Sequence, residues 1–526
     1  MIDTLPGRAR ADADQSNAGR RRHSAAVGRS IAVAACTPVL AFAAHTARAQ
    51  PATARGAAVV RDSTRRDSIA VSSDAANADV LTTIGSPRDE RARVAQLFTD
   101  STAGYLLRAT STITRLLPGP TGGYHVTWLA PEVRVTDNSA LPTSDNDGAL
   151  WAGRGTSVLA RAGAALRAGA VTVIVAPEFV RASNLPFQST PSGPTGQFPA
   201  TGPFASPFFT GVYSADLPIR FGDQPYTLVI PGQSSIFVTY GAVATGLSSE
   251  NMWWGPGLQN AILLSNAAEG FPHAFVRTAH PLRTKIGDIE AQYFLGGLTR
   301  SLYYDPHGRP DDRFLNGAAV TLRLRAEPGL TLGLARMVLS AEHDQGAVVV
   351  HALDVLTRYE SLGKADTLVE PRGTDQLASA FARWVFPSAH AELYGEFARL
   401  ELPRTIRDFL IAPMNTGAYT IGGARAFRTP DAGAVRVALE LTNLEQTRYF
   451  TDRPPPPDYY TGRAAGAGFT SRGQPLGAAI GPGSSSQWIG ADYFGARGRL
   501  GVYLRRERLQ NDALYRQFLA NALRHD

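Results

Sequence analysis

The chain has 526 residues, including 51 glycines and 35 prolines, and only 18% of its residues are charged. Its mean hydropathy of −0.12 excludes a bundle of membrane-spanning helices, but it suits a membrane β-barrel, in which apolar and polar positions alternate and average out. The first 49 residues hold seven arginines and three aspartates, so the formal net charge of +7 falls to +3 beyond them, and the composition does not indicate a nucleic-acid-binding protein.

The N-terminus has the layout of a secretory signal peptide. Arg20–Arg22 precede an apolar run from Ile31 to Ala44, and Ala47–Ala49 forms an Ala-x-Ala cleavage pattern, so we predict that residues 1–49 are a signal peptide. A single membrane anchor is the alternative. The run is shorter than the roughly 20 apolar residues that span a bilayer, and Pro38 interrupts it.

The single cysteine, Cys36, lies inside this leader. Val33–Cys36 also fits a lipoprotein box, although few apolar residues precede it. Cleavage after Ala49 leaves a chain without cysteine, which excludes disulfides, thiolate metal sites and thiol nucleophiles. Export without disulfides is typical of a protein of the bacterial envelope.

Two segments separate the leader from the body of the chain. Residues 50–85 are rich in Ala, Ser, Thr, Asp and Arg and lack an apolar period, which predicts a disordered linker. Ser86 and Pro87 then suit the N-cap and first position of a helix, and Asp89 lies near its positive end. An apolar stripe of helical period follows, formed by Val94, Leu97, Phe98, Leu106 and Leu107. We therefore expect a helical segment over residues 86–118.

From Gly153 onward the pattern changes to alternating apolar and polar residues, broken by Gly and Pro turns. In residues 319–336 two alternating runs flank Glu327–Gly329, which predicts a β-hairpin. Similar patterns occupy residues 156–176 and 435–442. Alternation fits a soluble β-sandwich as well as a membrane barrel. In a barrel the polar positions would line the interior, and among them are Arg323, Arg325, Arg436 and Glu440.

The most distinctive stretch is Asn251–His273, in which two tryptophans adjoin Gly255–Gly257. This Gly-Pro-Gly triplet cannot continue a helix or a central strand, so the tryptophan pair is predicted to lie at a sharp bend. The run Ser248–Gly257, followed by Leu264–Ala268, resembles the capsule assembly (Wzi) family of outer-membrane β-barrels. The match departs from the family pattern at Ala267, where a second Asn is common.

Two further segments resemble the same family less specifically. They are Tyr459–Gly462 with Gly473–Gly477, and Leu393–Glu396, so that the similarity covers roughly residues 154–505. The resemblance implies an all-β fold, a large antiparallel outer-membrane β-barrel of roughly eighteen strands over residues 119–526. It also implies that the short N-terminal helical element lies at the periplasmic end of the barrel.

The end of the chain departs from this expectation. Barrels of this kind commonly finish on a strand with a terminal aromatic residue, whereas this sequence ends on Leu519–Asp526. Either the ending differs from that of the family or a last hairpin is missing from the sequence, because an open sheet edge is not viable in a bilayer.

No catalytic motif stands out. The sequence contains no HExxH, GxSxG or Walker loop, and its histidines do not pair at metal-ligand spacing. Glu392 and Glu396 share one face of a strand, but four residues correspond to about 13 Å. That distance exceeds the roughly 5 to 9.5 Å between the carboxyl groups of glycosidases. We therefore expect no enzymatic activity, no cofactor and no metal site.

Aromatic rings stack on the apolar faces of sugars, and amides and carboxylates bind sugar hydroxyls. Together with the resemblance, this implies a lectin-like protein of the bacterial outer membrane that attaches or organises exported capsular polysaccharide at the cell surface. The candidates for contacting the polysaccharide or for shaping the motif are Asn251, Trp253, Trp254, Asn260, Asn266, Glu392, Tyr394, Glu396, Tyr459 and Tyr460. We expect a monomer whose partners are this polysaccharide and outer-membrane lipid. The alternatives are an outer-membrane porin and an exported polysaccharide-degrading enzyme.

Overall fold

The structure is a computed structural model. It describes residues 81–99, 105–114, 123–188, 208, 213–303, 313–341, 352–357, 374–402, 406–411, 413–446, 458–462, 466–496 and 498–514. All of them belong to one compact unit of the chain, Val59–Asp526. The predicted signal peptide, residues 50–80 of the predicted linker and the sequence end at Leu519–Asp526 lie outside the described residues.

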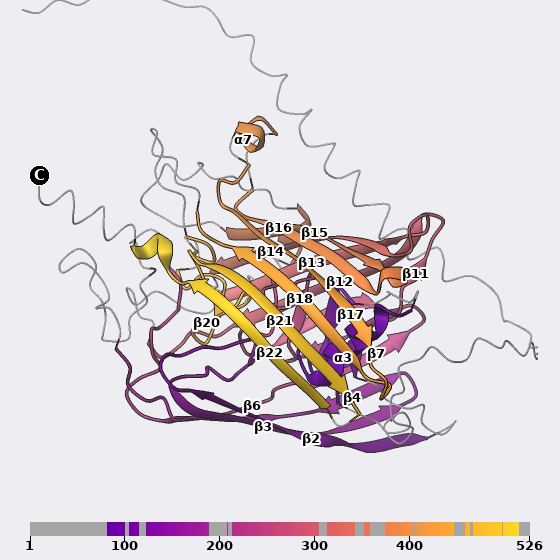
Figure 1. The fold of residues 1–526 in the computed structure, drawn as a ribbon, viewed down its shortest axis with the longest axis horizontal. Helices are drawn as coiled ribbons and strands as arrows, with labels where there is room; N and C mark the ends of the chain where they lie inside the picture. The colour runs from indigo at the N-terminus through magenta and orange to yellow at the C-terminus, as the bar shows by residue number, and fades with distance from the viewer. Residues whose placement is uncertain are drawn as a thin grey trace, which may run out of the picture. The chain divides into compact units, whose positions relative to one another are not determined.

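Among the described residues, eighteen strands share one antiparallel sheet whose strand order is that of a closed barrel (Figure 1). They are β2 (Tyr124–Asn138), β3 (Gly155–Ala168), β4 (Val171–Val175), β5 (Glu178–Ala182), β6 (Tyr226–Ile230), β7 (Ser235–Tyr240), β8 (Val243–Ser248), β10 (His273–Thr278), β11 (Leu282–Arg283), β12 (Gly287–Leu298), β13 (Arg313–Leu324), β14 (Leu330–Ala341), β15 (Thr374–Phe386), β16 (Ala391–Leu400), β17 (Gly417–Arg428), β18 (Ala434–Asn443), β21 (Ser485–Gly495) and β22 (Gly498–Arg508). The predicted all-β barrel is confirmed, and so is its strand number.

The other elements are small. Two further sheets have two strands each, β1 (Leu107–Ala109) with β9 (Met252–Trp254) and β19 (Thr470–Ser471) with β20 (Gln474–Pro475). The helices are α3 (Pro87–Gln96), α4 (Thr110–Ile113), α6 (Asp354–Thr357), α7 (Ile406–Ile411) and the 3₁₀ turn η1 (Pro387–Ala389). In the described part of the chain, none of the helices combines the length and the apolar character that crossing a bilayer requires.

Short turns and long connections lie at opposite ends of the barrel. Short turns join β3 to β4, β13 to β14, β17 to β18 and β21 to β22, whereas long connections follow β2, β8 and β18. Outer-membrane barrels place short turns on the periplasmic side and long loops on the outside. The two ends are called here the short-turn end and the long-loop end.

The predicted hairpins over residues 319–336 and 156–176 are present. Val320 pairs with Leu334 across the β13–β14 hairpin, and Ala168 pairs with Val171 across the β3–β4 turn. Strand β2 precedes the region in which the sequence showed regular alternation. Its register shifts between Leu129 and Glu132, around a proline that cannot donate a ladder hydrogen bond, so the alternation is interrupted there.

Registered pairing runs from β2 and β3 through the sheet to β21 and β22. Between β22 and β2 themselves, the described residues show no residue-by-residue register. An ion pair spans this junction, because Arg505 of β22 contacts Asp145 in the connection that follows β2.

The two faces of the sheet differ as a membrane barrel requires. On β18, Val437, Leu439 and Leu441 are 41–48% exposed and form the outer face, whereas Arg436 and Glu440 are buried inside. The outer, apolar face suits lipid and the inner, polar face suits a lumen. The predicted inward direction of Arg436 and Glu440 is therefore confirmed. Arg323 lies on β13 in an ion pair with Asp288, while Arg325 falls in the β13–β14 turn and is exposed.

The N-terminal helical segment differs in part from the prediction. The Ser86 hydroxyl caps α3 by accepting from the Asp89 amide at 3.3 Å, as expected. The helix ends at Gln96, however, and Leu107 opens strand β1 instead of extending the apolar stripe. Residues 81–85, the last of the predicted linker, include three buried side chains, Leu81, Thr83 and Ile84.

Candidate functional site

Three segments of the chain occupy the interior of the barrel. We call them the N-terminal segment (residues 81–99 and 105–114), the motif segment (residues 249–272) and the tyrosine loop (residues 458–462 and 466–480). Apolar residues of all three share one buried cluster with inward-facing strand residues such as Phe294 and Phe381. The barrel wall is therefore packed against protein on its inner side.

The tryptophan pair forms the centre of this packing. Strand β9 pairs with β1 so that Trp254 lies opposite Leu107. The Trp254 ring lies 5.3 Å from that of Phe294, and its indole nitrogen donates to the Gln292 side chain at 2.8 Å. Trp253 lies under the guanidinium of Arg108 at 4.9 Å. Both indoles are fully buried.

The chain bends directly after the tryptophans, as predicted. Gly255 has a φ of +108°, and a Cβ there would lie 2.8 Å from a carboxylate oxygen of Glu396. Glycine is therefore needed both for the backbone conformation and for the close approach to β16.

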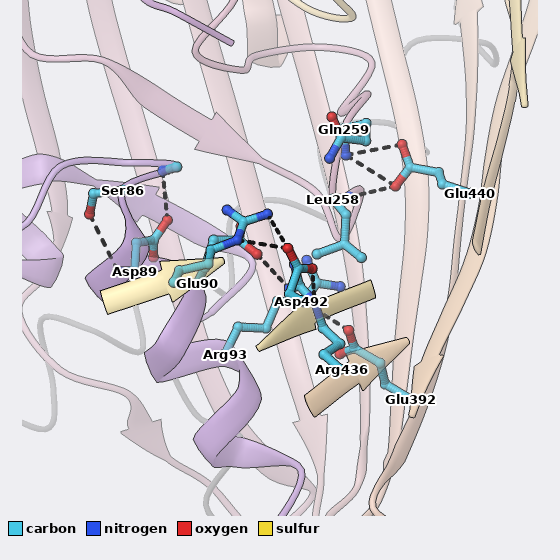
Figure 2. A network of polar contacts seen from close by, with 12 residues as sticks. Ser86, Asp89, Glu90, Arg93, Leu258, Gln259, Glu392, Arg436, Glu440 and Asp492 are labelled. Atoms are coloured by element: carbon cyan, nitrogen blue, oxygen red, sulfur yellow. Dashed lines mark hydrogen bonds and ion pairs between the residues drawn. The ribbon is translucent and has the colours of Figure 1, made fainter. Parts of the chain in front are cut away.

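Two carboxylates of the barrel wall hold the backbone that follows the bend. Glu440 accepts from the amides of Leu258 at 2.5 Å and Asn260 at 2.7 Å, and also from the amide between them (Figure 2). Tyr394 adds a hydroxyl donor to Glu440 at 2.8 Å. Glu396 accepts from the amide of Ile262 at 3.0 Å. These four hydrogen bonds to backbone amides fix the motif segment to β16 and β18.

Helix α3 docks on the same wall through buried ion pairs, and Figure 2 shows them together with the contacts of Glu440. Arg93 reaches Glu392 at 2.9 Å, and Arg383 of β15 reaches the other oxygen of Glu392 at 2.6 Å. All three side chains are almost completely buried. The carboxylate of Glu392 thus pairs with a cation of the helix and with a cation of the wall.

A second ion-pair group lies one turn earlier on α3. Arg436 of β18 contacts Glu90 at 2.5 Å and Asp492 of β21 at 2.7 Å. Burial by itself would raise the pKa of Glu90, but Arg436, Arg499 and Arg93 outweigh it and lower that pKa to about 2. Glu90 is therefore ionised throughout the physiological range.

Contacts within the N-terminal segment also join its parts to one another. Arg108 contacts Asp89 at 2.5 Å, and the Tyr105 hydroxyl donates to the Asp89 backbone carbonyl at 2.7 Å. Burial, followed by the charge of Asp89, raises the pKa of Tyr105 well above its usual value, so its hydroxyl stays protonated and remains a donor. These contacts join the start of α3 to strand β1.

The tyrosine loop also packs against the motif segment. The Tyr460 hydroxyl donates to the Ile262 carbonyl at 2.6 Å and accepts from the Ala478 amide at 2.7 Å. The Tyr459 ring meets the Tyr460 ring edge-on at 5.0 Å. At Gly477 a Cβ would collide with the Ile262 carbonyl and with the Tyr460 hydroxyl.

An ion pair also joins these two segments. Arg472 of the tyrosine loop contacts Glu269 of the motif segment at 2.5 Å. Burial raises the pKa of Glu269 to about 7, because Arg472, which is partly exposed, offsets only part of the desolvation.

The three asparagine candidates bond within the protein. The Asn251 amide group donates to the Ala268 carbonyl at 2.7 Å. The backbone carbonyl of Asn260 accepts from the Thr420 hydroxyl at 2.9 Å. The Asn266 side-chain amide donates to a backbone carbonyl in the connection after β2 at 2.7 Å. The backbone carbonyl of Asn266 accepts from a backbone amide of the same connection, also at 2.7 Å. Asn266 therefore fixes a long connection to the motif segment.

The structure brings all ten candidate residues into the barrel interior and buries each of them. Glu392, Tyr394 and Glu396 alternate along β16 and face inward together, as their spacing predicted. Sequence reasoning missed two residues of α3, Arg93, which pairs with Glu392, and Glu90, which pairs with the predicted lumen residue Arg436. One signal was available in the sequence. The first turns of the predicted amphipathic helix carry charges, and the predicted lumen also carries charges that could pair with them.

A pocket lies at the long-loop end, among connections from distant parts of the sequence. Its volume is about 290 Å³. Its lining includes Trp151, Phe187, Thr143, Glu507, Gln510 and Ala267 of the motif segment. Sequence reasoning did not single out these residues, because they are scattered over three connections and the end of β22 and form no local motif.

No group of three or more His, Cys, Asp and Glu side chains in the described part of the chain is arranged to hold a metal ion. The acidic residues of the interior instead accept hydrogen bonds from backbone amides or pair with arginines.

Comparison with known proteins identifies one family. The family model described as capsule assembly protein Wzi matches residues 232–522. Comparison with curated protein sequences finds no match. Among solved structures, the chain is similar to Wzi of Escherichia coli, an outer-membrane protein involved in group 1 capsule assembly and described as a carbohydrate-binding β-barrel, with 13% identity over 74% of this chain and 71% of that chain and a TM-score of 0.47. Weaker similarity extends to a triple mutant of a Rhodopseudomonas blastica porin (10% identity, 73% of this chain, 98% of that chain, TM-score 0.25) and to Pseudomonas aeruginosa OpdK with vanillate (10%, 75%, 84%, 0.27).

Proposed function

Because the chain belongs to the Wzi capsule assembly family of outer-membrane β-barrels, we propose that it is a non-enzymatic, lectin-like protein that attaches or organises exported polysaccharide at the cell surface. It acts as a monomer surrounded by outer-membrane lipid. The polysaccharide meets the protein at the long-loop end, which faces outward in an outer-membrane barrel.

The observation that carries the proposal is the filled barrel. The N-terminal segment, the motif segment and the tyrosine loop pack into one buried cluster with the inner wall. A diffusion porin needs an open aqueous lumen, whereas here inward-facing Glu440, Glu396 and Arg436 bond to protein. A barrel filled in this way leaves its outer end as the surface available to a polymer.

The same packing argues against the polysaccharide-degrading alternative. Glu392 bonds to two arginines and Glu396 bonds to the Ile262 amide, and both carboxylates are buried. A glycosidase needs two carboxyl groups on either side of a bound sugar, with room for water in an inverting enzyme. These two carboxylates support the interior of the barrel instead of a substrate site.

We assign the ten candidate residues to shaping the interior. Each is buried, and the contacts of Trp254, Tyr460 and Asn266 are all with other parts of this chain. A sugar would have to displace the motif segment or the tyrosine loop to reach them. Their role in the proposed function is to hold the loop-bearing connections in place.

The test compares cells with and without the gene for retained and released surface polysaccharide, and measures binding of that polysaccharide to the purified, detergent-solubilised protein. We expect released polymer to rise in the deletion strain and the protein to bind the polymer. Equal retention combined with no measurable binding would refute the proposal. Planar-bilayer recording addresses the porin alternative, since a filled barrel should give no steady current and large steady currents would favour a channel.

A further inference from the structure

The pocket at the long-loop end combines an aromatic wall with polar groups. Trp151 is held by its surroundings, because the Tyr226 hydroxyl donates to its carbonyl at 3.0 Å and its ring packs on Phe221 at 4.9 Å. A Cβ at Gly153 would lie 2.7 Å from the Trp151 ring, so glycine there lets the indole lie close to the backbone. Trp151 and Phe187 line the pocket with apolar rings, the kind of surface on which a sugar ring stacks.

Three polar side chains of the lining have hydrogen-bonding capacity left over. Within the described residues, the Thr143 hydroxyl and the Gln510 amide group make no hydrogen bond, and Glu507 has a single partner, Arg505 at 3.1 Å to one oxygen. Glu507 and Gln510 lie at the end of β22, and Thr143 lies in the connection after β2. The groups therefore converge on the pocket from two directions.

The charge of the lining favours an uncharged ligand. Glu507 is the only charged residue among the side chains that line the pocket in the described structure, and no Lys or Arg is among them. Arg505, its neighbour, is already shared with Asp145. An acidic sugar would bring a second carboxylate to Glu507 without a cation to offset it, whereas the hydroxyls of a neutral sugar can donate to it.

The motif segment positions this pocket. Ala267 forms part of its lining, and the neighbouring Asn266 bonds to Asn146 and Gly148 in the connection that carries Thr143 and Trp151. Gln474 of the tyrosine loop also lines the pocket and donates to the Ala267 carbonyl at 3.2 Å. The motif segment therefore contributes Ala267 to the lining and contacts two other segments that line the pocket, the connection after β2 and the tyrosine loop.

We propose that this pocket is a subsite for one neutral hexose unit of the polysaccharide, with the sugar ring stacked on Trp151 and its hydroxyls bound by Glu507, Gln510 and Thr143. The inference rests on the proposed polysaccharide-binding function and adds the place and the class of sugar. The volume of the pocket, about 290 Å³, lies at the small end of the range for ligand sites. A pocket of this size suits a single sugar unit and not a long stretch of polymer.

The test measures binding of full-length protein in detergent to two probes, neutral hexose oligomers (maltohexaose, cellohexaose and mannohexaose) and hexagalacturonate. The variants are Glu507→Gln, which keeps the size of the side chain, and Trp151→Ala. The controls are Glu327→Gln in the β13–β14 turn and Tyr124→Ala, an exposed aromatic on β2. A heat-modifiable gel shift equal to that of the wild type shows that each barrel is folded.

We expect the wild type to bind at least one neutral hexamer at least tenfold more tightly than hexagalacturonate. Glu507→Gln and Trp151→Ala should each weaken that binding about tenfold or more, while the two control variants bind as the wild type does. If the wild type binds the native surface polysaccharide and Glu507→Gln binds it equally well, or if hexagalacturonate binds best, the subsite is wrong and the proposed function stands. If the wild type binds neither the hexamers nor the native polysaccharide, the proposed function falls and the subsite falls with it.

Discussion

The two ends of the barrel interior are held by different forces. At the short-turn end, α3 docks on the wall through buried ion pairs, with Arg93 on Glu392 and Glu90 on Arg436. Only a small apolar cluster, formed by Val94 and Leu97 with residues of the wall, accompanies them. Toward the long-loop end, the tyrosine loop joins the motif segment mainly through hydrogen bonds to backbone groups and through contacts too close for any residue but glycine.

This difference determines how each end responds to change. A buried ion pair is costly to break by removing one partner, because the other charge stays buried without compensation. Ion pairs also depend on pH. Contacts between backbone groups are insensitive to pH but leave no room for added atoms. The docking of α3 should therefore be sensitive mainly to the loss of a charge. The packing of the tyrosine loop should be sensitive mainly to added volume, apart from the ion pair between Arg472 and Glu269.

The largest expected effect follows from removing the charge of Glu392, which pairs with an arginine of α3 and with an arginine of the wall. Glu392→Gln keeps the shape of the side chain but leaves Arg93 and Arg383 buried without a counterion. We expect a loss of about 3–5 kcal/mol in the free energy of unfolding. Denaturant unfolding in detergent, followed by gel mobility, measures it. Glu327→Gln, in an exposed turn, is the matched control and should change stability by less than about 0.5 kcal/mol. A wild-type stability for Glu392→Gln would mean that the ion pairs do not hold the helix.

The next prediction concerns the pH dependence of the free energy of unfolding, to which Glu90 and Glu269 contribute in opposite directions. The folded pKa of Glu90, about 2, lies below its ordinary value of 4.5, so its contribution is complete above pH 4.5 and is lost as the pH falls toward 2. The folded pKa of Glu269, about 7, lies above 4.5, so the protein gains stability as the pH falls from about 7 to 4.5. Each contribution should reach about 3 kcal/mol at most.

Unfolding free energies at pH 7.5, 4.5 and 2.5 test this pattern in the wild type and in two variants. Glu90→Gln should reduce the loss of stability between pH 4.5 and 2.5, and Glu269→Gln should reduce the gain between pH 7.5 and 4.5. If each variant keeps the wild-type pH profile, these carboxyls are not the groups that titrate.

Much of the barrel wall was predictable from the sequence. The alternation of Val437, Leu439 and Leu441 with Arg436 and Glu440 gave both the strand and its inner face, because period-2 patterns reflect the two sides of a sheet directly. The interior was less predictable. Whether lumen charges such as Arg436 face water or protein depends on which distant segment folds in, and single-strand patterns do not contain that information.

The candidate site shows the same division. The Trp-Trp-Gly-Pro-Gly run predicted a bend and a distinctive structural role, and Gly255 makes that bend. The burial of Tyr459 and Tyr460 could not be predicted, since a tyrosine pair near turn residues fits an exposed sugar platform equally well. The pocket around Trp151 and Glu507 was also hidden, because its parts are more than 350 residues apart in the sequence.

A smaller effect tests the close packing of the tyrosine loop. Gly477→Ala places a Cβ against the Ile262 carbonyl, a backbone atom that cannot move aside without shifting the motif segment. We expect a loss of about 2–3 kcal/mol, typical of overpacking in a dense interior. Gly297→Ala is the control, because nothing lies within 4 Å of the added Cβ there. Equal unfolding free energies for the two variants would show that the tyrosine loop is not closely packed.

The smallest effect distinguishes the two neighbouring tyrosines. Tyr460→Phe removes a hydroxyl that bonds to the Ile262 carbonyl and to the Ala478 amide, leaving two buried backbone groups unpaired at a cost of about 1–2 kcal/mol. The Tyr459 hydroxyl is buried and has no hydrogen-bond partner among the described residues, so Tyr459→Phe should be neutral or slightly stabilising. Unfolding free energies of the two variants, measured side by side at pH 7.5, give the comparison. Because both changes remove one oxygen from adjacent buried rings, the difference between them isolates the hydrogen bonds by which the tyrosine loop holds the motif segment, and an equal loss in both variants would assign that role to ring packing instead.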